Sequence, residues 1–397
     1  MEARIPGRWI VLAVLFAARA ATGFQFQSVG STTNLLMHDL ALGYAQLGML
    51  LGAYLLPGIV VAFPAGLIGQ RVRETTLGLG GLALMAVSGI ALAYCDNFAA
   101  ALIARVIGGV GATIVILVAT KMTTDWFAGR EIVLAMSLLQ MSWPFGAMVA
   151  LPAQTYLAQS LGWPAVMASS AILALVALGA FTLLPRSPAP AEAATAARTS
   201  LPGRILVPIL VAGAIWGAMN LACVLFFSYA PQVMVAQGSS PTGAASLVGL
   251  AIWFTIIAIP AGGYLVERSG RPVAAIIVCG LAAALALGLF VANIHPTVAC
   301  LVFGIAIGPL SGAILSLPTR VLEPRDRSLG FGLFFTCFYI LMAIGPSAAG
   351  RLQDAWGKPS VALIAGAALL AAMAPLSLLF SLLIKRREVI TLKPATA

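Results

Sequence analysis

Charged residues are scarce in this chain of 397 residues: Asp, Glu, Lys and Arg together make up 9% of it, whereas hydrophobic residues make up 61%. Water-soluble domains carry about 25% charged residues, so the composition excludes that class of protein. The two histidines and five cysteines show neither the spacing of metal ligands nor a disulfide framework. Paired catalytic carboxylates, histidine-bearing triads and glycine-rich phosphate loops are missing as well. We therefore expect no enzyme, no metal site and no cofactor.

Long apolar runs, in contrast, recur along the whole chain. A run of about 20 residues is enough to cross a bilayer as a helix. Twelve spans are predicted, near residues 9–29, 47–69, 76–94, 98–122, 132–157, 164–184, 205–229, 244–266, 273–292, 297–319, 328–350 and 360–384. The first run follows two arginines, as in a secretory signal, but it continues past Arg19 with more apolar sequence, which favours a retained helix. The predicted fold class is an all-α polytopic membrane protein.

The positive charges indicate the orientation. Most of the 22 Lys and Arg residues fall in the ends and loops on the same side as the amino terminus. Because positive residues collect on the cytoplasmic side, both termini are predicted to be cytoplasmic, in an inner or plasma membrane. The net charge of +10 then reflects this bias and attraction to an anionic leaflet of the lipid bilayer, so no nucleic-acid partner is expected.

Acidic residues are missing from the middle of every predicted span, and both histidines lie at span ends. Two arginines, Arg19 and Arg105, do fall inside spans. An ionisable residue in the membrane is costly and usually functional, and a guanidinium stays charged, so we expect an anionic partner. Arg19 is the predicted central anion-binding residue, and Arg105, at a similar estimated depth, could clamp the same anion. The alternative is that each arginine binds helix carbonyls and serves the fold.

Neighbours of Arg19 follow from the helical period and from an internal offset of 197 residues. Thr22 shares the face of Arg19, and the offset aligns Arg19 with Trp216, whose face continues through Asn220. Polar or aromatic residues in other spans complete the predicted substrate contacts: Tyr54, Gln140, Trp143, Trp253 and Tyr339. Together they predict a narrow aromatic cage, although aromatic residues at helical spacing are often only part of the core.

The chain divides into two related halves. Residues 185–203 are rich in Pro, Ala, Ser and Thr and separate six spans from six, which predicts bundles at 1–184 and 204–397 joined by a cytoplasmic linker. Gln70 and Arg71 stand 197 positions before Glu267 and Arg268. The same offset relates Arg130 to Arg327.

A family resemblance rests on these repeats. Gly263-Tyr-Leu-Val-Glu-Arg-Ser-Gly-Arg-Pro272 resembles the loop signature of the major facilitator superfamily, in which Gly, an acidic residue, Arg, Gly and Arg follow one another. The first copy is degraded, with Gln70 at the acidic position and Arg73 at the second Gly. Arg105-Val-Ile-Gly-Gly-Val-Gly-Ala112 is similar to the superfamily's Arg and Gly-rich stretch in helix 4. The resemblance implies two pseudo-symmetric six-helix bundles and a set of gating residues: Gln70, Arg71, Arg130, Glu267, Arg268, Arg271 and Arg327.

The expected function follows from the fold and the intramembrane charge. The run from Trp126-Phe127 to Arg130-Glu131 and the central Arg19 are loosely similar to branches that carry cyanate, nitrate or organic anions. We expect a monomeric secondary active transporter that moves a small inorganic or organic anion by alternating access, with anion exchange as the favoured coupling. Two alternatives stay open: multidrug or metabolite efflux by the same fold, and a membrane ligand sensor that transports nothing.

Overall fold

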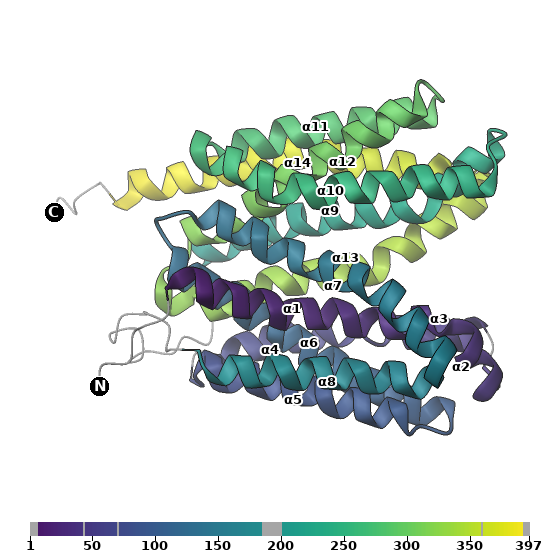
Figure 1. Cartoon of the computed structure of the whole chain (residues 1–397). Helices are drawn as coiled ribbons and strands as arrows, with labels where there is room; N and C mark the ends of the chain where they lie inside the picture. Colours follow the sequence, from purple (N-terminus) through teal and green to yellow (C-terminus); the bar gives the residue numbers. More distant parts are fainter. Residues whose placement is uncertain (1–6, 43, 70, 185–200, 359, 392–397) are drawn as a thin grey trace. The chain divides into compact units, whose positions relative to one another are not determined.

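The computed structural model describes residues 7–42, 44–69, 71–184, 201–358 and 360–391. Every element in these ranges is a helix, and twelve helical segments are long and apolar enough to cross a membrane (Figure 1). The predicted class, an all-α polytopic membrane protein with twelve spans, is confirmed. The predicted linker lies largely outside the described residues, so the division into domains around it stays a prediction.

The chain forms two compact units, which we call unit 1 and unit 2. Unit 1 comprises Met1–Arg130, Leu139–Thr199 and Pro324–Thr336, and unit 2 comprises Glu131–Leu138, Ser200–Glu323 and Cys337–Ala397. Each unit therefore includes a short segment of a helix whose other part belongs to the other unit.

Unit 1 is built around α1 and α6. Its elements are α1 (Arg8–Ser31), α2 (Thr33–Asp39), α3 (Tyr44–Gly52), α4 (Pro57–Ile68), α5 (Glu74–Ala93), α6 (Phe98–Phe127), most of α7 (Ile132–Leu161), α8 (Trp163–Thr182), η3 (Pro324–Asp326) and the start of α13 (Arg327–Trp356). Helix α5 packs against both α6 and α8, and α1 packs against α6 and α8. The side chain of Asn97 starts α6 by accepting a hydrogen bond from the backbone N–H of Ala100 at 2.9 Å, as a helix N-cap does.

Unit 2 is likewise a bundle of long helices. Its elements are α9 (Gly203–Ala236), α10 (Pro241–Ser269), α11 (Pro272–Val291), α12 (Pro296–Ser316), η2 (Pro318–Arg320), α14 (Ser360–Thr391), the first residues of α7 and the rest of α13. Helix α10 packs on α12, α9 on α14, and α11 on both α12 and α14. Proline stands in the first turn of α10, α11 and α12, where its missing N–H leaves no bond unmade.

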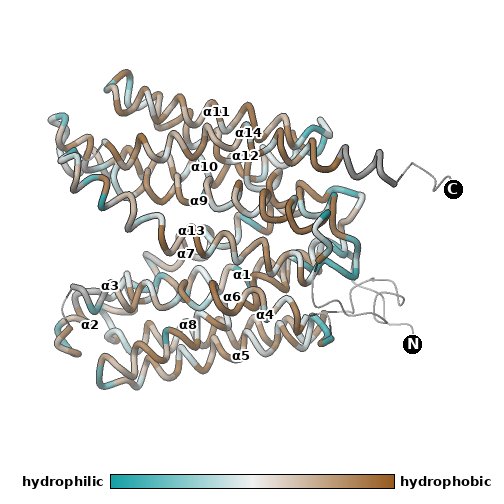
Figure 2. Tube along the Cα trace, turned by 180° about the vertical axis from the view of Figure 1, so that it is seen from behind, coloured by the Kyte–Doolittle hydropathy of each residue, from teal (hydrophilic) through white to brown (hydrophobic). Residues whose placement is uncertain are grey.

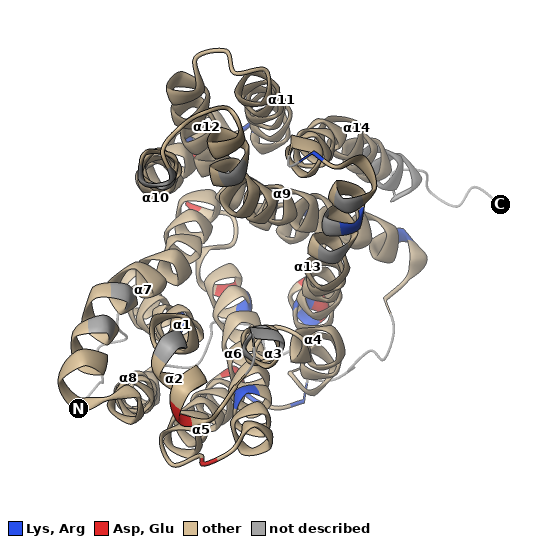
Figure 3. Ribbon diagram, turned by 90° about the vertical axis from the view of Figure 1, so that its right-hand side faces the viewer, with Lys and Arg blue, Asp and Glu red and all other residues tan. Residues whose placement is uncertain are grey.

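The surface of the spans is apolar. Figure 2 shows hydrophobic residues along the helices, and Figure 3 shows that charged residues are few on the ribbon. Large aliphatic side chains such as Val60, Ile103 and Leu285 are more than 60% exposed. A bilayer explains this exposure, because lipid rather than water surrounds these side chains.

The second span is interrupted. We expected a continuous helix over 47–69, but α3 ends at Gly52 and α4 begins at Pro57. The carbonyl of Gly52 accepts from the N–H of Leu55 and of Leu56, at 2.9 and 3.0 Å, which closes the chain into a turn. Pro57 then opens α4 at a position where a helix tolerates proline. The span itself is confirmed, and the break exposes carbonyls that need other donors.

Helices α1 and α7 approach closely within unit 1. A Cβ atom on Gly23 would lie 2.2 Å from the carbonyl oxygen of Trp143, and one on Gly146 would lie 2.0 Å from that of Ala20. No larger residue fits at either crossing point without moving the helices. Two glycines thus let the backbones approach, as small residues do at helix interfaces in membranes.

Candidate functional site

Arg19 is buried in α1, with 4% of its surface exposed. Its Nη1 donates a hydrogen bond of 2.7 Å to the carbonyl of Leu139 on α7, the helix that Gly23 and Gly146 hold close. The hydroxyl of Thr22 donates to the carbonyl of Arg19 itself, at 2.7 Å, so it serves α1 in this conformation. The arginine is therefore positioned between two helices of unit 1, at about 16 Å along α1 from its first residue.

Arg105 is fully buried on α6 and donates to three carbonyls. Nε donates to Leu50 at 3.1 Å, and the two terminal nitrogens donate to Gln25 and Phe26 at 3.0 and 3.2 Å. Its guanidinium also lies 4.5 Å from the centre of the Tyr54 ring, a cation–π contact. These bonds tie α6 to α1 and to the end of α3, just before the break.

The two arginines donate to different backbone carbonyls. Two of the three carbonyls that Arg105 binds belong to residues six and seven positions beyond Arg19 on α1, a rise of about 9 to 10 Å. The structure thus shows Arg105 tying helices of unit 1 together. A direct contact between Arg105 and substrate stays a prediction.

Three aromatic rings gather near the same stretch of unit 1. The ring of Phe26 lies 5.9 Å from Tyr54 and 5.4 Å from Trp143, between centroids. The Tyr54 hydroxyl donates to the carbonyl of Thr22 at 3.1 Å. Two residues predicted from different spans therefore meet around a third, within a turn or two of Arg19.

Residues predicted in unit 2 are only partly brought together. Trp216 is 1% exposed, and its ring lies 6.2 Å from that of Phe338, which in turn lies 4.9 Å from Tyr339. The amide nitrogen of Asn220 donates to the carbonyl of Trp216 at 2.8 Å. Trp253 is 53% exposed on α10, as an outward-facing residue would be. Trp216, Phe338 and Tyr339 thus form one aromatic row, whereas Trp253 lies on the exposed face of α10.

Buried amides were missed at the sequence level. Gln25 donates to the carbonyl of Met85 at 2.8 Å, and Gln154 donates to that of Phe24 at 2.9 Å and accepts from Ser31. Both glutamines are fully buried. The signal was available, because a polar residue inside an apolar span needs partners, but our reasoning weighted charge over amides.

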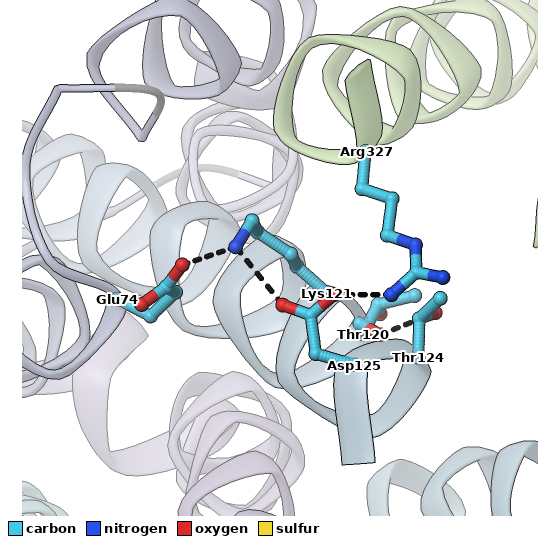
Figure 4. A network of polar contacts seen from close by, with 6 residues as sticks. All are labelled: Glu74, Thr120, Lys121, Thr124, Asp125 and Arg327. Atoms are coloured by element: carbon cyan, nitrogen blue, oxygen red, sulfur yellow. Dashed lines mark hydrogen bonds and ion pairs between the residues drawn. The ribbon is translucent and has the colours of Figure 1, made fainter. Parts of the chain in front are cut away.

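A buried ion cluster was also missed. Figure 4 shows Lys121 of α6 between the carboxylates of Glu74 and Asp125, with Arg327 of α13 on the far side of Asp125. The Lys121 to Asp125 and Arg327 to Asp125 contacts measure 3.0 and 2.6 Å. The Asp125 side chain is 1% exposed, and two cations balance two anions. Of these residues only Arg327 was predicted as functional.

Glu267, predicted as a gating residue of the second signature copy, forms hydrogen bonds in the structure. Glu267 accepts hydrogen bonds from the N–H groups of Val133 and Leu134, the first turn of α7, where the helix dipole favours a negative charge. Gly270 ends α10 with a φ of 63°, a left-handed conformation that suits glycine. This geometry explains why the signature has an acidic residue and a Gly at these positions.

Other predicted gating residues behave differently. Arg71, Arg130, Arg268 and Arg271 are exposed and form no ion pair within the part of the chain that the structure describes. Gln70 lies outside the described residues. Arg130 and Arg327, related by the internal offset, therefore differ: only Arg327 is bound in the buried cluster.

An apolar groove of about 740 Å³ runs along α3, α4 and α6. Its walls include Met49, Leu56, Val60 and Val106, and it offers no charged side chain to an anion. The groove is therefore separate from the Arg19 region.

Comparison with known proteins agrees with the architecture. The family model of the Major Facilitator Superfamily matches residues 15–346 and matches again over 224–395. The solved proton:xylose symporter XylE has a TM-score of 0.79 at 14% identity, covering 94% of this chain and 95% of that one. A variant of the E. coli fucose:proton symporter FucP has a TM-score of 0.70 at 16% identity, covering 92% and 98%.

A third structure is the human organic anion transporter MFSD10, with a TM-score of 0.70 at 18% identity, covering 95% of this chain and 99% of that one. Identities this low show a common fold and leave the substrate open. No curated protein sequence matches the chain. The family model spans most of its length and the twelve spans are in place, so the chain belongs to the major facilitator superfamily.

Proposed function

We propose that this member of the superfamily is a secondary active transporter of a small inorganic or organic anion, with Arg19 as the central binding residue. The observation that carries the proposal is a guanidinium buried within a membrane span, where it donates to a carbonyl of α7. An ionisable residue inside the membrane is costly and usually functional, and a guanidinium keeps its charge when buried. A carboxylate or another oxyanion matches its planar fork of donors.

The distribution of carboxylates supports the same proposal. The acidic side chains of the described spans lie near helix ends, as Glu74, Asp125 and Glu267 do. Proton coupling through a carboxylate in the middle of the membrane is therefore disfavoured. A charge sealed from water without its counterion is costly, so a bound anion lowers the barrier to closing the site. This coupling favours exchange of one anion for another during alternating access.

The proposal includes an orientation and a role for the helix ends. We place both termini on the cytoplasmic side of the plasma membrane, because the positive charges collect on that side. We expect the monomer to be the working unit. Within unit 2, Glu267 holds the first turn of α7, and within unit 1, Arg327 holds Asp125. These contacts must break whenever the segments they hold leave their units, so both are gating contacts in our scheme.

A second candidate function is efflux of apolar compounds. The apolar groove along α3, α4 and α6 favours it, since its volume suits a drug-sized ligand. The permanent positive charge of Arg19 disfavours cationic drugs as substrates. A protein that binds an anion without moving it would instead be a ligand sensor.

Thermal unfolding of the detergent-purified protein tests the proposal. The panel contains small inorganic anions, mono- and dicarboxylates and lipophilic cations. A ligand at about 100 times its dissociation constant adds roughly 2.7 kcal/mol to the stability. We expect stabilisation by an anion that disappears in Arg19→Gln and persists in Arg351→Gln, an exposed control at the end of α13. Stabilisation by lipophilic cations alone would favour efflux.

Transport in proteoliposomes completes the test. An anion that stabilises the protein should enter faster when the same anion is loaded inside. Arg19→Lys keeps the charge but loses the planar fork of donors, so partial transport is expected. Binding without any uptake would favour the sensor, and uptake without acceleration by internal anion would refute exchange.

A further inference from the structure

Gln140 is an amide without a partner. Its Oε1 atom is buried and accepts no hydrogen bond, and Gln140 makes none elsewhere among the described residues. The residue as a whole is partly exposed, although its Oε1 atom is buried. A buried acceptor without a hydrogen bond is unfavourable in a protein interior, and such groups are uncommon.

The other glutamine in α7 shows what a structural amide looks like. Gln154 is fully buried, donates to the carbonyl of Phe24 and accepts from the hydroxyl of Ser31. Both ends of that amide are used to join α7 to α1. Gln140, about four turns away on the same helix, forms no hydrogen bond within the described part of the chain. Packing therefore explains Gln154 and leaves Gln140 unexplained.

The position of Gln140 connects it to Arg19. Arg19 donates to the carbonyl of Leu139, the residue that directly precedes Gln140, with consecutive Cα atoms about 3.8 Å apart. Trp143, one turn further along α7, contacts Phe26 of α1. Gln140 lies about 12 Å along α7 from its first residue, near the middle of a core about 30 Å thick. A guanidinium, an amide and an aromatic pair thus occupy one stretch of two neighbouring helices, whose packing Figure 1 shows.

The chemistry of an amide narrows the ligand. Its oxygen is a hydrogen-bond acceptor and its NH₂ group is a donor, and a half turn of the amide exchanges their positions, so a ligand at this place meets both an acceptor and a donor. An anion such as nitrate has hydrogen-bond acceptors only and would leave the glutamine oxygen without a donor. A hydroxyl group can donate to the oxygen and accept from the nitrogen, whichever way the amide turns.

We infer that the substrate is an anion with a hydrogen-bond donor beside its charged group, a 2-hydroxycarboxylate being the simplest form, and that Gln140 selects it. Arg19 would hold the carboxylate and Gln140 the hydroxyl. This inference rests on the proposed function, because it assumes that Arg19 binds the anion. The aromatic pair of Phe26 and Trp143 offers a wall for an apolar substituent on the same acid.

Matched acids test the inference. Lactate is compared with propionate, and mandelate with phenylacetate, by thermal shift and by competition for uptake into proteoliposomes. Wild-type protein should prefer each hydroxy acid over its deoxy partner at least tenfold, since a site built to bind a hydroxyl discriminates strongly against its absence. Gln140→Leu should erase this preference while deoxy acids still bind. Gln154→Leu, the matched change on the same helix, should lower stability and keep the preference.

The outcomes separate the two proposals. Equal binding of hydroxy and deoxy acids by wild type, or an unchanged preference in Gln140→Leu, overturns the role of Gln140, while Arg19→Gln still abolishes anion binding. No binding of any anion by wild type overturns the proposed function and this inference with it. Gln140→Asn, which keeps the amide but shortens its reach, should give a reduced preference, and a full preference in that variant would also contradict the assignment.

Discussion

The crossing of α1 and α7 gives the sharpest structural prediction, because replacing Gly146 by Ala should separate the two helices. The new Cβ atom would lie 2.0 Å from the carbonyl oxygen of Ala20, and such contacts essentially never fall under 3.0 Å. The difference, 3.0 − 2.0, requires a displacement of at least 1.0 Å. If α7 moves by this amount, the bond from Arg19 to Leu139 lengthens from 2.7 to 2.7 + 1.0 = 3.7 Å, beyond the range of a hydrogen bond.

The cost can be estimated from its two parts. Overpacking a tight interface costs about 1–3 kcal/mol. Losing a hydrogen bond to a charged group costs about 1.5–3 kcal/mol. We expect Gly146→Ala to lower the free energy of unfolding by about 2.5–6 kcal/mol before the gain of roughly 1 kcal/mol that Ala brings to a helix interior.

Thermal unfolding in detergent measures this change. The control is Gly80→Ala in α5, where a Cβ atom meets nothing within 4 Å and only the helix-propensity gain applies. Gly146→Ala should unfold well below wild type, Gly80→Ala slightly above it, and only Gly146→Ala should weaken anion binding through Arg19. Equal midpoints for both variants would refute the argument that the helices are held at closest approach.

Three further predictions concern the buried ion cluster, the carboxylate of Asp39 and the contact between α7 and α10. Asp125→Asn should lower the free energy of unfolding by about 3–5 kcal/mol, because it leaves Lys121 and Arg327 without their shared anion. The same change at the exposed Asp96 should be nearly neutral, and similar losses in both variants would contradict the buried cluster. Hydrogen bonds from His38 and Trp163 lower the pKa of Asp39, so the stability that its carboxylate contributes should be present above about pH 4 and be lost as the pH falls below that value. In thermal scans over this pH window, Asp39→Asn should lose less stability than the wild-type protein. A Cβ on Gly263 would lie 2.1 Å from the hydroxyl oxygen of Ser137, so Gly263→Ala should destabilise the protein and Ser137→Gly should restore most of the loss in the double variant; additive effects would rule out this contact.

The sequence predicted the class, the number of spans and the family because these depend on composition and on repeats that extend over hundreds of residues. It did not predict the break in the second span. A proline such as Pro57 can bend a continuous helix or stand in the first turn of a new one, and only the turn at Gly52 decides between the two. The carbonyls near that break explain Arg105, whose role depends on a local backbone geometry that spacing alone does not show.

The candidate site was predicted unevenly for a similar reason. A charge inside a span is visible in the sequence, so Arg19 could be found. The missing hydrogen bond to the Gln140 oxygen is visible only once the positions of the surrounding side chains are known. The ion cluster was missed because Glu74, Lys121 and Asp125 stand near helix ends, where charged residues are usually solvated. The cluster also includes Arg327, which is far away in the sequence.

That separation has a consequence for biosynthesis. Arg327 follows Asp125 by 202 residues, yet both belong to unit 1. At roughly 5–20 residues per second, the ribosome needs on the order of 10–40 s to supply the missing cation. Until then Lys121 alone serves the two acids Glu74 and Asp125, with one negative charge in excess. The part of the protein made first therefore cannot complete its own interior, and a ribosome that stalls before Arg327 leaves an amino-terminal half with an unbalanced carboxylate that quality-control proteases can recognise.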